Sequence, residues 1–156
     1  MRALILVLML PLSAVADEAS DRYATISSYV KFGAITDPDV KASVDVAHEA
    51  QTQANLEFQK AVCTKRDYYE INAPALADAL DEQTARLTKI ATDEMKNLDA
   101  VLARKPDVKV LVENLTNSNL VQIGHPPEGA TDAIRARTDN SELLDHICAT
   151  TVVAEE

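Results

Sequence analysis

The clearest pattern along the chain is a helical spacing of apolar positions between residues 39 and 73. This stretch contains no glycine or proline, and its apolar side chains recur at three-, four- and seven-residue steps. A stripe of this period predicts one long amphipathic helix with a buried face. Thr36 is the expected cap, Pro38 lies in the first turn and Asp39 completes a capping box. The stripe comprises Val40, Val44, Ala47, Ala54, Phe58, Val62 and Tyr69.

A second long helix is predicted from residues 72–74 to Lys105, immediately before Pro106. Glu82 and Arg86 lie four residues apart on its outer face, so we expect them to form an ion pair. Each long helix has roughly 30 residues and a length of about 45 Å, and a connection this short makes the two antiparallel neighbours. The buried stripe of the second helix comprises Leu76, Leu80, Leu87, Ile90, Ala91, Leu98, Val101 and Leu102.

The segments on either side of the long helices carry weaker patterns. Residues 20–35 fit both a helical face and a strand, and we favour a short helix because no other segment is a clear strand partner. Residues 108–123 fit a helix that follows Pro106, or two strands joined by a turn at residues 116–119, and helix is again favoured.

Towards the C-terminus, residues 124–129 have the glycine and proline content of a loop. Residues 131–137 and 141–152 predict two short helices, the second capped by Asn140 or Ser141. The predicted fold class is therefore mainly α, with an antiparallel long-helix hairpin and additional short helices packed as a small bundle.

The aromatic residues that follow residue 16 all lie between Tyr23 and Tyr69. We expect Tyr23, Tyr29 and Phe32 to pack near Phe58 and Tyr69, because large aromatic side chains dominate the cores of small domains. The alternative is that Tyr68 and Tyr69, beside Cys63, form an exposed aromatic patch of the kind that anchors interfaces.

The first sixteen residues have the pattern of a cleavable secretory signal peptide. Arg2 provides a short positive region, residues 3–12 are an apolar run, and residues 13–16 end in small side chains before Asp17. The apolar run is shorter than the about 20 residues of a membrane-spanning helix. We therefore expect residues 17–156 to form a single helical domain in the periplasm, with secretion to the extracellular space as the alternative.

The excess of acidic residues argues against negatively charged partners. The chain has 15 basic and 25 acidic residues, and loss of the leader with Arg2 leaves 14 basic residues and a net charge of −11. Nucleic acids and anionic membranes attract positive surfaces, so neither is an expected partner. No later stretch is long and apolar enough to predict membrane insertion after leader removal. Residues 106–156 are the most acidic part, with 3 basic and 9 acidic side chains.

The two cysteines, Cys63 and Cys148, predict one structural disulfide. An even cysteine count in a small exported domain is typical of such a bridge. The alternatives are two free thiols or a bridge between molecules. No Cys-x-x-Cys pair is present, so a thioredoxin-like redox function has no support.

Motifs for catalysis or cofactor binding fail on inspection. His48 and Glu49 resemble the start of a zinc-protease motif, but Thr52 stands where the second histidine is required. We considered a metal site on Glu142, Asp145 and His146, but a solvated polar helix face explains these residues better. We also considered haem ligation by Met95 and His146, but a methionine in this pattern is more often a core residue. We therefore expect no catalytic, cofactor-binding or metal-binding residues.

The remaining candidate is a loop in which His125 precedes Pro126 and Pro127. A rigid loop is able to present a side chain to a partner, although the favoured interpretation is a loop that only separates two helices. The sequence thus favours an exported non-enzymatic helical protein that binds another macromolecule, most simply another protein, as an envelope adaptor, inhibitor or immunity-type protein. The alternative is a small-ligand or metal carrier that uses the bundle interior.

Overall fold

In the computed structural model, which describes residues 12–118 and 130–149, every regular element is a helix. The predicted mainly helical fold is confirmed. The helices are α1 (Leu12–Lys31), α2 (Pro38–Thr64), α3 (Arg66–Ile71), α4 (Ala73–Ala103), α5 (Pro106–Ser118), α6 (Ala130–Arg135) and α7 (Ser141–Ala149).

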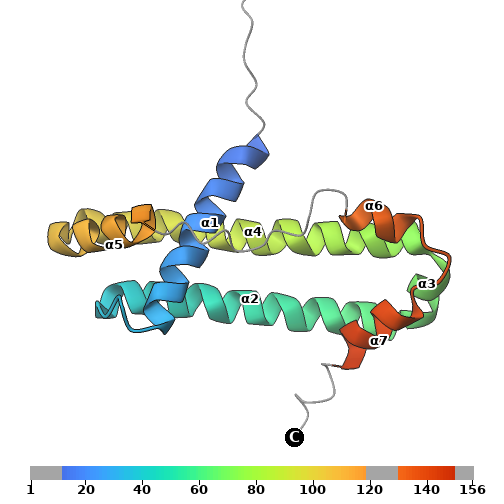
Figure 1. Ribbon diagram of the computed structural model, residues 1–156. Coiled ribbons are helices and arrows are strands. Elements are labelled where there is room, and N and C mark those ends of the chain that lie inside the picture. Colours follow the sequence, from blue (N-terminus) through green and yellow to red (C-terminus); the bar gives the residue numbers. More distant parts are fainter. Residues whose placement is uncertain (1–11, 119–129, 150–156) are drawn as a thin grey trace, which may run out of the picture.

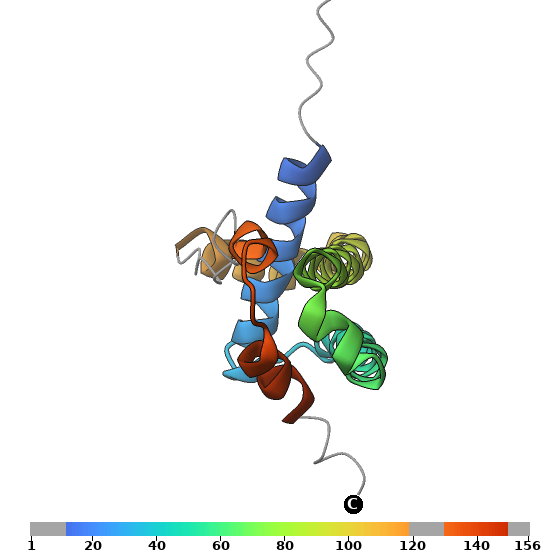
Figure 2. The ribbon, with the colours of Figure 1, turned by 90° about the vertical axis from the view of Figure 1, so that its right-hand side faces the viewer.

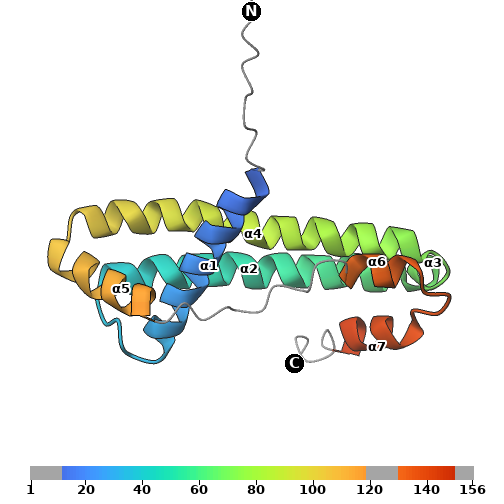
Figure 3. The ribbon, with the colours of Figure 1, turned by 45° about the horizontal axis from the view of Figure 1, so that its top comes forward.

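The long helices α2 and α4 lie side by side along most of their length (Figures 1 and 3). The helix α1 crosses both of them near one end, where α5 also packs, and Figure 2 shows its first turns projecting away from the rest. At the other end, α6 packs on α4 while α7 packs on α2 and α3. The molecule is therefore a long helix pair with a group of shorter helices at each end.

The prediction of one unbroken helix over residues 39–73 is wrong. α2 ends at Thr64, the backbone changes direction at Lys65 (φ −112°, ψ 30°), and the six-residue α3 follows. The sequence has no glycine or proline at this break. We attribute the break to tertiary packing, since α3 contacts α4 and α7 after the turn. Asn72 then caps α4, its side-chain oxygen accepting a hydrogen bond from Ala75 N at 3.2 Å.

The predicted cap of α2 is also corrected. Asp37, rather than Thr36, occupies the cap position, and its Oδ1 accepts hydrogen bonds from Asp39 N at 3.0 Å and Val40 N at 3.1 Å. Pro38 is the first helical residue, where its missing N–H costs nothing.

Two separate hydrophobic cores lie along the α2–α4 pair. The α1 core contains Tyr23, Ile26, Ile35, Val40, Val44, Ala47, Ala91, Met95, Leu98, Leu102 and Val112. The α7 core contains Val62, Leu76 and Leu144, with Phe58, Tyr69, Leu80, Ile134, Leu143 and Ile147 packed around them. The first half of α2 and the second half of α4 therefore line the α1 core, and the remaining halves of the two helices line the α7 core.

The predicted aromatic cluster is wrong because of this division. Tyr23 and Tyr29 belong to the α1 core, Phe58 and Tyr69 belong to the α7 core, and Phe32 is 86% exposed. α1 meets the first half of α2, and Phe58 lies twenty residues beyond Pro38, a distance of about 30 Å along the helix.

The helix favoured for each of the two weaker segments is confirmed for most of their described residues, but residues 32–35 lie beyond the end of α1 and are not helical. Residues 20–31 belong to α1, and α5 is helical to Ser118, whereas residues 119–123 lie outside the described residues. The predicted cleavage point between Ala16 and Asp17 falls within α1. Among the described helices, none combines the length and the apolar character needed to cross a bilayer.

Candidate functional site at the α3–α7 end

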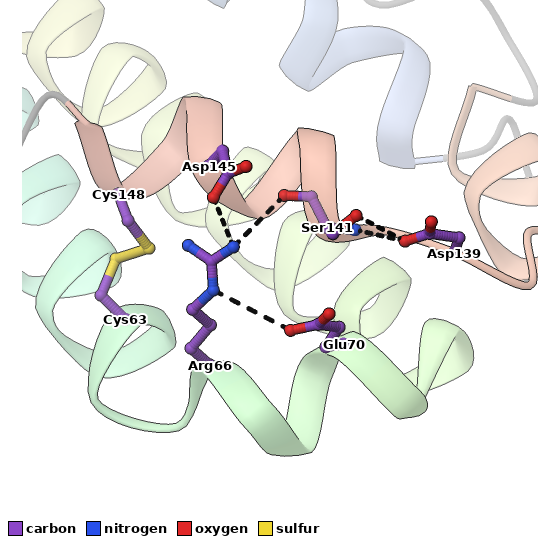
Figure 4. A network of polar contacts seen from close by, with 7 residues as sticks. All are labelled: Cys63, Arg66, Glu70, Asp139, Ser141, Asp145 and Cys148. Atoms are coloured by element: carbon purple, nitrogen blue, oxygen red, sulfur yellow. Dashed lines mark hydrogen bonds and ion pairs between the residues drawn. A yellow bond between two sulfur atoms is a disulfide. The ribbon is translucent and has the colours of Figure 1, made fainter.

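A disulfide joins the two cysteines at the end of the molecule where α3 lies. Cys63 is in the last turn of α2 and Cys148 is near the end of α7, with their Cα atoms 5.7 Å apart (Figure 4). The bridge links positions 85 residues apart in sequence, and both side chains are half-buried. The pairing predicted from the sequence is the one that the structure contains, and it attaches α7 to α2.

Arg66, the first residue of α3, makes a second link to α7 beside the disulfide (Figure 4). Its Nη2 donates to Asp145 Oδ1 and, at 3.5 Å, to the backbone oxygen of Ser141, while its Nε lies 3.9 Å from Glu70 Oε2. The hydrogen bond with Asp145 is the largest cause that raises the pKa of Arg66 above its usual value. The guanidinium therefore holds the short α3 and α7 together.

The start of α7 is capped by a residue that the sequence analysis did not choose. Asp139 Oδ1 accepts from Ser141 N at 2.9 Å and from Ser141 Oγ at 2.7 Å, and these bonds lower the pKa of Asp139. Asn140 is buried, with 1% exposed, and neither polar atom of its side chain has a hydrogen-bond partner in the structure. Asn140 holds the position before the first residue of α7, and its backbone oxygen accepts from Leu144 N at 2.9 Å, but the side chain that bonds the start of the helix is that of Asp139.

The helix α6 is attached to the same end through charge pairs with α4. Arg135 Nη2 lies 2.6 Å from Asp78 Oδ1 and 3.1 Å from Asp81 Oδ2. Together with the α7 core, the disulfide and Arg66, these pairs fix the two C-terminal helices against the long helices.

The outer side of α3 faces solvent with apolar side chains. None of the six α3 residues is buried, and Ile71 is 87% exposed while Tyr68 is 50% exposed. Tyr69 instead packs against the α7 core, with its ring edge-on to that of Tyr68 at 5.2 Å between centroids. The candidate site is this exposed face of α3, which we call the α3 tip: Tyr68 and Ile71.

No protein-family model, curated protein or solved structure matches the chain. The α3 tip is therefore interpreted from its own residues. Next to it, an open groove of about 360 Å³ runs between α2 and α4 and is lined by Phe58, Ala61, Tyr69 and Arg86 among others. Tyr69, the residue between Tyr68 and Glu70, is the part of α3 that lines this groove.

The other candidate residues from the sequence lie away from the α3 tip or outside the described residues. His125, Pro126 and Pro127 lie outside the described residues. The disfavoured metal ligand Asp145 is paired with Arg66, and over residues 12–118 and 130–149 no three metal-binding side chains gather. Met95, 3% exposed, belongs to the α1 core, whereas His146 lies on α7 at the other end.

Only part of the α3 tip was evident in the sequence. Tyr68 and Tyr69 were weighed as an exposed aromatic patch, but core packing was favoured, and the structure exposes Tyr68 while Tyr69 packs on the α7 core. Ile71 was not singled out, because the residues of α3 were interpreted as the end of a continuous helix. Arg66 carries no local signal either, since its main partner, Asp145, is 79 residues away.

Proposed function

We propose that this is an exported, non-enzymatic protein that binds another protein through the α3 tip, in the periplasm or after secretion. The observation that supports it is the exposure of Tyr68 and Ile71 on a helix that is itself firmly held. The three-residue spacing places both side chains on neighbouring positions of one helix face. Large apolar side chains that protrude together are typical anchors of protein interfaces.

The attachments around α3 support the proposal because they lower the cost of binding. Ordering flexible side chains and segments on association costs free energy, so a surface that is already ordered binds more tightly. The disulfide and the Arg66 contacts hold α3 and α7 in one geometry. In this proposal α2 and α4 form an antiparallel hairpin that serves as the rigid support of the tip.

The carrier alternative is not proposed. A carrier that uses the bundle interior needs an enclosed cavity between the helices, and neither core offers a described cavity that supports this alternative. The hollows described at this end are grooves open to solvent.

The proposal is tested by affinity capture with the tagged mature protein from the cell envelope of the producing organism. Ile71→Asp should abolish capture of the partner, because a carboxylate would have to be desolvated in the interface. Val110→Asp, a matched change at a 56% exposed valine of α5, should leave capture unchanged. A partner lost with Val110→Asp and retained with Ile71→Asp would place the interface elsewhere.

A further inference from the structure

A second groove, away from the α3 tip, has a buried acid at its wall. It lies between the start of α2 and the end of α4, has a volume of about 560 Å³, and is open to solvent. Its residues include Ser43 and Val46 from α2, and Glu94, Asn97 and Val101 from α4. Neither the disulfide nor α3 contributes to it, so its test is independent of the proposed function.

Glu94 is 9% exposed, and its described hydrogen-bond partners are neutral. Its Oε1 accepts from Ser43 Oγ, and its Oε2 accepts from Asn97 Nδ2 at 3.3 Å. An ionised carboxylate has about four acceptor positions, so each oxygen is able to accept a further bond. Burying a carboxylate is costly unless a positive charge or several hydrogen bonds compensate for it.

Two cations, Arg104 and Lys105, also line the groove, but no ion pair among the described residues joins either of them to Glu94. Lys105 Nζ lies 2.8 Å from Asp37 Oδ2 and 2.6 Å from Asp39 Oδ2. Arg104 follows Glu94 by ten residues, which separates their backbones by about 15 Å along α4. Neither side chain neutralises Glu94.

Tyr23, a buried neighbour of Glu94, does not donate a hydrogen bond to it. Burial is the main cause that raises the pKa of Tyr23 to about 12, and the charges of Glu94 and Asp45 act in the same direction, against a hydrogen bond with Ser27. The Tyr23 hydroxyl donates to Val44 O at 3.2 Å, so the Glu94 carboxylate does not receive this proton.

We propose that this groove binds a lysine side chain of a partner protein, with the ammonium group on Glu94 and the alkyl stem against Val46 and Val101. Val46 is 61% exposed and Val101 half-buried, so a stem would cover apolar surface. A compact ammonium needs only one of the acceptor positions that remain on the Glu94 oxygens, whereas an arginine fork has to occupy one on each oxygen in a single plane, so lysine is the less demanding occupant.

The shape of the groove and the charge of the chain select a protein as the source of the ammonium group. Sites for free small molecules enclose most of the ligand surface, and this groove is open. The net charge of −10 attracts a positively charged partner.

A purely structural role for Glu94, joining α2 to α4 through Ser43, is separable from lysine binding. Glu94→Gln keeps an acceptor for the Ser43 hydroxyl, removes the charge, and puts an amide donor in place of the oxygen that accepts from Asn97. Val46→Lys instead introduces a cation beside the groove and leaves Glu94 in place. Glu49→Gln is the matched control, because Glu49 is an exposed acid of α2 and its change alters the net charge equally.

The experiment is an NMR titration of the mature protein with the blocked peptide acetyl-Ala-Lys-Ala-amide. Saturable shifts are expected at the amides of Ser43, Val46, Asn97 and Val101. Norleucine in place of lysine should weaken binding about tenfold or more, as should Glu94→Gln and Val46→Lys, while Glu49→Gln binds like the wild type. Thermal melts within about 3 °C of the wild type confirm that the variants are folded.

Three outcomes would overturn the proposal. Shifts scattered over the acidic surface, or equal weakening by Glu94→Gln and Glu49→Gln, would show non-specific attraction. Unchanged binding in Val46→Lys, with Glu94→Gln unfolded, would leave Glu94 with a structural role alone. Binding of n-butylammonium without binding of the blocked peptide would assign the groove to free amines instead of a protein side chain.

Discussion

At the scale of single residues, burial separates side chains of the same chemical type. Leu98 is completely buried and Val46 is mostly exposed, although both lie on long amphipathic helices. The helical period was sufficient to place Leu98, because a three- to four-residue spacing defines one face of a helix.

Leu98→Ala should lower the free energy of unfolding by about 2–5 kcal/mol, because it leaves a cavity in the α1 core. Glu82→Ala, an exposed control on the same helix, should cost less than about 0.5 kcal/mol. Urea unfolding measures both changes. Equal losses would show that the helical phase of α4 is wrong.

Charge pairs were harder to predict than burial. The expected partner of Arg86 was Glu82 on the same helix, but Arg86 Nη2 lies 2.6 Å from Glu57 Oε2 of α2, and this contact lowers the pKa of Glu57. The i,i+4 rule compares positions within one helix and contains no information about the neighbouring one.

Asp37 provides a prediction about acid stability. The hydrogen bond from Lys105 is the main cause that lowers the pKa of Asp37, and backbone hydrogen bonds from Val40 and Asp39 add to it against the effect of burial. A lowered folded-state pKa contributes stability above the unfolded value of about 3.9, and this contribution is lost as the pH falls further.

Asp37→Asn should therefore destabilise the protein at pH 7, and the difference from the wild type should shrink on acidification to pH values below about 4. Urea unfolding across this pH range measures the difference. A gap that stays constant with pH would mean that the charge of Asp37 makes no contribution.

At the scale of elements, α7 is too short to be stable by itself. It has nine residues, whereas isolated helices need about 12–15 even with favourable composition. Its stability comes from Leu144 in the α7 core, the disulfide and Arg66. The apolar side and the cysteine were sufficient to predict α7, whereas the break at Lys65 has no local signal.

Replacing Cys63 and Cys148 together by serine should lower the melting temperature and speed hydrogen exchange in α7 more than in α4. The chain-entropy model gives an upper limit of about 4.5 kcal/mol for a closed loop of this length. Unchanged exchange in α7 would show that the disulfide is not needed to hold it.

At the scale of the whole molecule, the helix content was predictable but the division into two cores was not. The stripes on α2 and α4 are continuous in sequence, and which half contacts α1 or α7 depends on how the short helices pack. The misplaced aromatic cluster has the same origin. The exposed α3 tip depends on the break at Lys65, so the sequence offered Tyr68 only as part of a disfavoured aromatic patch and did not single out Ile71.

Export is the prediction that concerns the whole chain. Cleavage after Ala16 would leave the α1 residues that the structure places in the core, from Ala19 onward. N-terminal analysis of the exported protein should find Asp17 as the first residue. Retention of Met1 and Arg2 in exported protein would contradict the assignment of a cleavable leader.

The most direct test of binding through the α3 tip is photocrosslinking in living cells, with a photoreactive amino acid in place of Ile71 or, as the control, Val110. One discrete protein adduct is expected from position 71 and none from position 110, with both variants equally abundant. An adduct from position 110 without one from position 71 would contradict binding through the α3 tip.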